Sequence, residues 1–188
     1  MTDATEFASF WHGPLNPFAY ACLASFPQAG AMVRLYSYDA RLDVPPGVRL
    51  ADARLVCPDE TLIRRFIVNG KPSIAAFADM FRYKMIQATG SCWVDTDLVC
   101  LAMPQFTCEP YVFCRQADAV STQLVNNAIL RLPSSEPALI ELVTTAEAAI
   151  DAEQKWGALG PFLLTPVLQK RGFRRVSWLR ALEPQKHR

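Results

Sequence analysis

The sequence predicts an α/β fold whose sheet contains parallel strands, and three observations support this. The chain opens in the order strand, helix, strand, and strands joined through a helix usually lie parallel. Further β-forming segments alternate with helical patterns as far as residue 170. No repeat, low-complexity segment or linker interrupts the 188 residues, so we expect residues 1–188 to form a single domain.

The first elements have clear local signals. Residues 7–11 are short, apolar and aromatic, which is typical of a buried strand. Asn16 followed by Pro17 predicts the start of a helix, because asparagine caps helices and proline is favoured at the first helical position. This helix should end near residues 27–30, and residues 32–38 should form the second strand.

Three further helices are predicted. Ser73 caps the first, which should continue to about residue 88 and end at Gly90. A long alanine-rich helix should cover residues 136–156, and a last helix should cover residues 162–170. The helix after Ser73 has apolar residues at helical spacing, which predicts one buried face: Ile74, Phe77, Ala78, Phe81, Met85 and Ala88.

The remaining segments are shorter. Prolines and a glycine make residues 41–52 a loop with a short strand at 48–50, and residues 60–66 fit a short helix. Four apolar, β-forming segments predict strands: residues 92–94, 98–101, 111–115 and 126–132.

Composition limits the classes of function. Hydrophobic residues make up 51% of the chain and charged residues 20%, which is typical of a globular protein. A net charge of +1 provides no overall field to attract nucleic acid, so an anionic ligand must be bound by a local site. Without a leader sequence or a long apolar stretch, we expect a cytoplasmic protein with no transmembrane segment and no nucleic-acid partner. A peripheral contact with a membrane remains compatible with the sequence.

The cysteines and histidines do not suggest a zinc site. The six cysteines form no C-x-x-C pair, and His12 and His187 stand at opposite ends of the chain. Most of the cysteines have apolar neighbours, as buried reduced thiols do.

The sharpest motif is Asp95-Thr96-Asp97, which follows the apolar segment 92–94. In an extended segment, residues two apart point to the same side, so both carboxylates could face one ligand. Two anions this close repel each other, and a hard divalent cation would remove the repulsion and bridge to a diphosphate. The same residues would also suit a solvated turn between two strands.

A second pair of charges lies on the preceding helix. Asp79 and Arg82 are three residues apart and therefore share one side of that helix. Because the helix is otherwise largely apolar, we expect the pair to be partly buried and to face a cleft or a partner charge. Arginine is well shaped to bind phosphate or sugar oxygens, but an internal salt bridge would explain the pair equally well.

Together these residues resemble a family. Ala78-Asp79, Arg82-Tyr83, Gly90 and residues 93–97 are similar to the signature of glycosyltransferases with the Asp-x-Asp sugar-binding region. That group includes capsular-polysaccharide transferases, α1,4-galactosyl- and mannosyltransferases and, more distantly, the clostridial glucosylating toxins. The resemblance spans roughly residues 7–170, with weaker similarity around Phe10-Trp11-His12-Gly13, residues 35–39, Asn126-Asn127 and Gly160-Pro161.

The resemblance implies a GT-A-like, single Rossmann-like domain with a mixed, mostly parallel sheet. It implies a divalent metal, usually Mn²⁺ with Mg²⁺ as the alternative, at Asp97 and Asp95. It also implies a nucleotide-sugar donor, taken here as a UDP-sugar, bound by Trp11, Asp79, Arg82, Asp95 and Asn127. The expected reaction transfers a hexose to a carbohydrate or glycolipid acceptor with retention of configuration, but the sequence identifies no catalytic nucleophile.

The chain departs from the family pattern at two points. Gly90-Ser91 stands where relatives often have two glycines, and the C-terminal segment that completes the metal and phosphate site in many relatives is not recognisable. His187 could substitute for a residue of that segment, although a histidine so near a terminus is usually exposed.

Two other functions share some of these features. A phosphatase of the haloacid-dehalogenase class also has an Asp-x-Asp after an apolar strand. In that class, however, the motif lies near the N-terminus and an acidic cluster follows it, whereas here the motif lies at residues 95–97 and no such cluster follows. A non-catalytic domain that binds nucleotide-sugar and metal, such as an inactive homologue, remains the main alternative to a transferase.

Overall fold

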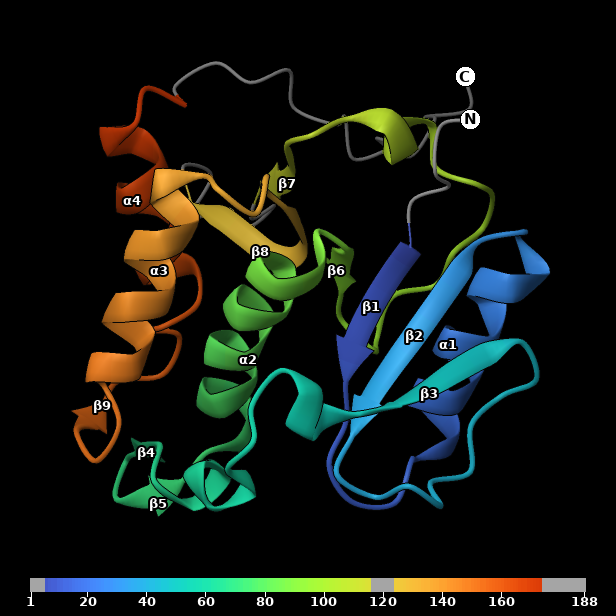
Figure 1. Ribbon diagram of the computed structural model, residues 1–188, viewed down its shortest axis with the longest axis horizontal. Helices are drawn as coiled ribbons and strands as arrows, with labels where there is room; N and C mark the ends of the chain where they lie inside the picture. Colours follow the sequence, from blue (N-terminus) through green and yellow to red (C-terminus); the bar gives the residue numbers. More distant parts are fainter. Residues whose placement is uncertain (1–5, 116–123, 174–188) are drawn as a thin grey trace, which may run out of the picture.

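The protein is described by a computed structural model that covers residues 6–115 and 124–173. Its centre is a six-stranded sheet in the order β3-β2-β1-β6-β8-β7, with helices on both faces (Figure 1). The strands of this sheet are β1 (Glu6–Phe10), β2 (Met32–Ser37), β3 (Val48–Asp52), β6 (Cys92–Val94), β7 (Val112–Arg115) and β8 (Val125–Arg131). The α-helices are α1 (Pro17–Gln28), α2 (Ile74–Thr89), α3 (Pro137–Ala148) and α4 (Pro161–Lys170).

The direction of the strands changes at β6. Strands β3, β2, β1 and β6 are parallel to one another, whereas β8 pairs antiparallel with both β6 and β7. The predicted mixed, mostly parallel α/β sheet is therefore confirmed. Since β1 and β6 are parallel neighbours, the residues that follow them meet at the same edge of the sheet.

The helix ends form as the sequence predicts. The Asn16 side chain accepts a hydrogen bond from the Ala19 N–H at 2.8 Å, and Ser73 does the same for Ala76 at 3.2 Å. Gly90 ends α2 with φ +68°, a left-handed conformation that glycine adopts without strain. These caps determine where α2 begins and ends, and hence where its charged residues lie relative to β6.

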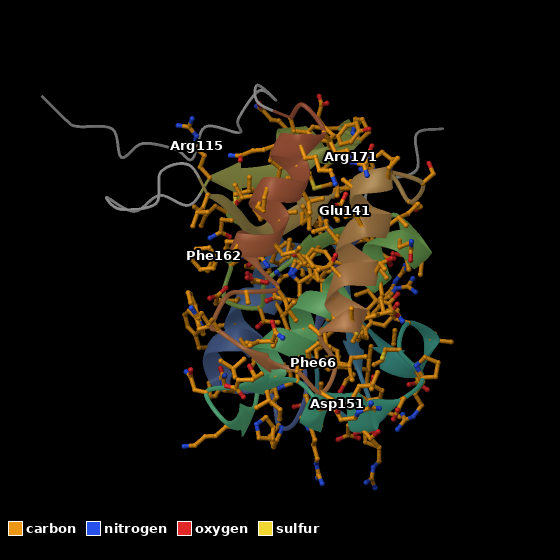
Figure 2. All side chains as sticks on the ribbon, turned by 90° about the vertical axis from the view of Figure 1, so that its left-hand side faces the viewer. Phe66, Arg115, Glu141, Asp151, Phe162 and Arg171 are labelled. Carbon is orange, nitrogen blue, oxygen red and sulfur yellow. The ribbon has the colours of Figure 1, made fainter. Side chains whose placement is uncertain are left out.

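The two faces of the sheet have separate hydrophobic clusters. On one face, α1 contributes Leu23 and Phe26, which pack with Phe7 and Val33 of the strands. On the other face, α2, α3 and α4 pack together over β1, β2, β6 and β8. Figure 2 shows α3 and α4 side by side on this face, with Glu141 of α3 close to Arg171 just after α4. The larger cluster thus fixes α2 and α4, the two helices that border the site described below.

Several predicted elements are wrong or shorter. Residues 98–101 form no strand, and residues 60–66 form only a 3₁₀ helix, Glu60–Arg64. The long helix predicted to reach residue 156 ends at Ala148, and the chain then turns through Asp151, whose φ is +64°. The Arg65 guanidinium binds the Asp151 carboxylate at 2.9 and 2.5 Å, which holds this turn in place.

A small second sheet follows that turn. Strand β9 (Glu153–Gln154) pairs with β4 (Ile67–Val68), which also pairs with β5 (Lys71–Pro72). Pairing with β4 draws residues 153–154 away from the helix that was predicted there.

No helix in the described part of the chain is long and apolar enough to cross a membrane. The single domain and the cytoplasmic location stay predictions.

Candidate functional site

A cleft of about 820 Å³ opens at the carboxyl ends of β1 and β6. Ser9 to His12, at and after the end of β1, form one wall, and α2 together with the loop before α4 forms the other. All the predicted site residues line this cleft, although their roles stay predictions: Trp11, Asp79, Arg82, Asp95, Asp97 and Asn127.

Arg82 joins the two predicted acidic sites. Its guanidinium contacts Asp79 Oδ1 through Nη1 and Asp95 Oδ1 through Nη2, both at 2.9 Å. The Arg82 side chain is only 6% exposed and lies over the Trp93 ring, 4.7 Å from its centroid. The Trp93 indole N–H also donates to Asp95 Oδ1 at 2.7 Å. The internal salt bridge weighed from the sequence therefore exists, but it extends to the Asp-x-Asp motif.

Asn127 and Gly160 complete this network on the side of Asp79. The Asn127 amide donates to Asp79 Oδ1 at 2.8 Å. A Cβ on Gly160 would lie 3.0 Å from both Asp79 Oδ2 and Asn127 Nδ2, which is closer than ordinary van der Waals contact. Glycine at this position therefore lets the start of α4 approach the Asp79 carboxylate.

Burial dominates the electrostatics of Asp79. Loss of hydration raises its pKa to about 6, and the negative charge of Asp95 adds to the rise, whereas Arg82 and Asn127 act in the opposite direction.

Two buried polar groups beside the network have unused hydrogen-bonding capacity. Arg82 Nε and the Ser9 hydroxyl are both buried and have no hydrogen-bond partner among the described residues, so the cleft has polar atoms suited to a ligand or to water.

Asp97 has very different surroundings. Thr96 and Asp97 form a turn after β6, and the Asp97 side chain is exposed in the cleft. It has no hydrogen bond or ion pair with any residue that the structure describes. Of the two geometries compatible with the sequence, the turn is therefore present, and both carboxylates still border one cleft.

These two carboxylates suit a hard divalent cation. Asp95 uses Oδ1 for Arg82 and Trp93, which leaves Oδ2 without a described partner. Mg²⁺ and similar ions commonly bind to one or two carboxylates together with substrate phosphates and water. Across residues 6–115 and 124–173, no group of three or more histidine, cysteine, aspartate or glutamate side chains could hold a metal alone. A cation at these two carboxylates would therefore need further ligands, such as water or a phosphate.

Trp11 directly follows β1 and is half-buried, as expected for a residue at the edge of the sheet. Its indole N–H donates to the Pro14 carbonyl at 3.1 Å, which fixes the ring beside the cleft. His187 lies outside the described residues.

Sequence reasoning missed several residues of the cleft. Trp93 precedes Asp95 by two positions, so strand alternation could have indicated that the two side chains share a face. Gly160 was noted only as part of a weak resemblance. Lys155 and Trp156 lie in the part of the predicted helix that does not form beyond Ala148, and nothing local indicates that they border the cleft.

Comparison with known proteins gives support for the fold alone. No protein-family model and no curated protein matches the sequence. The structure is similar to a solved protein described as PaToxG glycosyltransferase, with a TM-score of 0.55 and 12% sequence identity. The match covers 89% of this chain and 69% of that one. The chain therefore shares the fold of a glycosyltransferase, consistent with the GT-A-like architecture expected from the sequence.

Proposed function

We propose that the protein is a metal-dependent glycosyltransferase that moves a hexose from a UDP-sugar to a carbohydrate or glycolipid acceptor. One observation carries the proposal. Arg82 is fixed between Asp79 and Asp95 at the carboxyl edge of the sheet, and Asp97, which has no ion pair among the described residues, lies in the same cleft. A pre-arranged Asp–Arg–Asp network and an available carboxylate thus border one ligand-sized space.

Each part of the donor has a matching group. Asp97 and Asp95 Oδ2 would hold Mn²⁺, with Mg²⁺ as the alternative. When bound, the cation offsets the diphosphate charge and stabilises the leaving group. Trp11 offers an aromatic ring to the nucleobase, while Asp79 and Asn127 offer hydrogen-bonding groups to hydroxyls of the ribose or the transferred sugar. Arg82 orients these groups and contributes positive charge. Retention of configuration rests on the family resemblance, and no nucleophile is assigned.

A thermal-shift panel tests donor binding. The protein is heated with UDP-, GDP- and ADP-sugars, each with and without Mn²⁺, and we expect a UDP-sugar to raise the melting temperature only when the metal is present. Release of UDP from the best donor is then measured with water or sugars as acceptors. If no nucleotide sugar stabilises the protein under either condition, the proposal is wrong.

A non-catalytic nucleotide-sugar-binding domain is the second candidate. It is favoured by the small ligand set, because among the described residues Asp95 and Asp97 have no third carboxylate, histidine or cysteine beside them. Such a domain would show metal-dependent binding of a UDP-sugar in the thermal panel. It would release no UDP above the uncatalysed rate, with or without acceptor sugars.

A further inference from the structure

We propose that Trp156 is the stacking platform of an acceptor subsite that binds a hexopyranose ring. This inference rests on the proposed glycosyltransferase function and names the acceptor side of the same cleft. The Trp156 side chain is 73% exposed, yet it lines the cleft from the loop between β9 and α4. Exposed aromatic side chains are typical of the lining of small-molecule sites, and covering this ring with a ligand would gain about 25 cal/mol per Å² of apolar surface buried.

The backbone around Trp156 is held in place although its ring is exposed. On one side, β9 pairs with β4, and the Gly70 N–H binds the Glu153 carboxylate at 3.0 Å. On the other side, the Leu159 carbonyl accepts a hydrogen bond from the buried Tyr83 hydroxyl at 2.8 Å. Within the loop, the Ala158 N–H binds the Lys155 carbonyl at 3.1 Å. The ring is therefore offered from a pre-organised loop, which lowers the entropic cost of binding.

Trp156 comes from a different part of the chain than the groups assigned to the donor. Trp11 follows β1 and Asp95 and Asp97 follow β6, whereas Trp156 comes from the loop before α4, whose other end at Gly160 lies against Asp79. The cleft volume of about 820 Å³ is near the upper end of the range of about 300–1,000 Å³ found for small-molecule sites. We therefore place the donor at Asp97 and Trp11 and the acceptor at Trp156.

The chemistry of this wall suits a neutral sugar. The C–H groups of a pyranose ring pack against the electron-rich face of an indole. Gln154 and Lys155 beside Trp156, and Ser73 at the start of α2, also line the cleft and can bond to sugar hydroxyls. The carboxylates that line the cleft are those of Asp79, Asp95 and Asp97, which come from α2 and the turn after β6 rather than from this loop.

Sugar binding to three variants tests the inference. The protein is saturated with Mn²⁺ and UDP and titrated with methyl glucosides, galactosides and mannosides and with lactose, with binding followed by saturation-transfer NMR. We expect Trp156→Ala to weaken binding of the preferred sugar at least tenfold, and Trp156→Phe to weaken it less than threefold. Phe18→Ala is the matched control, because Phe18 is an aromatic residue, 63% exposed, that does not line the cleft.

Three results would overturn the inference. They are unchanged sugar binding in Trp156→Ala, no binding of any tested sugar to the wild type, or a loss of UDP-glucose affinity in Trp156→Ala that exceeds the loss of acceptor affinity. Failure of the proposed function is recognised separately, as absence of Mn²⁺-dependent UDP binding in the wild type. The titration without UDP then still decides whether Trp156 binds sugar.

Discussion

The two halves of the cleft are built in opposite ways. Around Arg82, every charged partner is already in contact, and the guanidinium is 6% exposed between Asp79 and Asp95. Around Asp97, the carboxylate is exposed and makes no hydrogen bond or ion pair within the described residues. The first half is already assembled without a ligand, so changes there should affect folding as well as binding. The second half is completed only by a ligand, so changes there should affect binding.

The largest effect is expected from Arg82→Ala. Removing the guanidinium leaves two carboxylates close together and partly buried, and breaking such a network costs about 3–5 kcal/mol of unfolding free energy. Urea denaturation measures this loss. Lys170→Ala is the control, because the Lys170 side chain of the Lys170–Glu141 pair is exposed and the pair should contribute less than about 1 kcal/mol. Similar losses in the two variants would contradict the view that the Arg82 half is prebuilt.

Asp97→Asn should instead affect ligand binding. We expect Mn²⁺-dependent UDP affinity to fall about 100-fold, or about 2.7 kcal/mol, while stability without ligand is unchanged or rises because one of two repelling carboxylates is gone. Calorimetric titration measures the affinity, and Asp43→Asn, an exposed aspartate outside the cleft, serves as the control. Equal Mn²⁺-dependent UDP affinity in Asp97→Asn and the wild type would contradict a metal site at Asp97. Loss of binding together with unfolding would favour the structural turn.

The titration of Asp79 should sharpen the comparison. Its pKa in the folded protein is raised to about 6, above the unfolded value of about 3.9, so the folded state binds more protons between these values. Stability should therefore fall as the pH rises from 4 to 6, by about 1–2 kcal/mol relative to Asp79→Asn. Urea denaturation across this pH range tests the prediction. A carboxyl NMR titration of Asp79 with a midpoint near 4 would contradict it.

The smallest effect is expected from Trp11→Phe. If the indole packs against the nucleobase, UDP should change the tryptophan fluorescence of the wild type and much less that of the variant, and affinity should fall about two- to fivefold. Trp156→Phe, which removes the tryptophan on the opposite wall, should keep the UDP response. If Trp11→Phe keeps the full fluorescence response to UDP and the full UDP affinity, Trp11 packs against the protein and does not contact the nucleobase.

The parts of the fold that depend on local signals could be predicted from the sequence. Asn16, Ser73 and Gly90 mark helix ends through their own hydrogen bonds or backbone angles, and these positions are correct. The end of α3 was missed because it depends on contacts distant in sequence, between Asp151 and Arg65 and between β9 and β4. An alanine-rich segment gives no local sign of such pairing.

The site was predictable to a similar degree. Asp79, Arg82, Asp95 and Asp97 stood out by residue type and spacing, and the cleft gathers them. The contact of Arg82 with Asp95 was not predictable, because it depends on how α2 packs against β6. The roles of Trp93 and Gly160 likewise follow from packing, one over the guanidinium and the other against the Asp79 carboxylate.

The loop between β9 and α4 has one constrained end and one free end. At Gly160, any side chain would press on Asp79 and Asn127, whereas the side chains of Lys155 and Trp156 are exposed at the cleft. Selection should therefore preserve Gly160 in all descendants of this gene, whereas residues 155 and 156 should change together with the ligand bound there. A lineage could then change what binds at the rim through single substitutions while the buried network below stays intact.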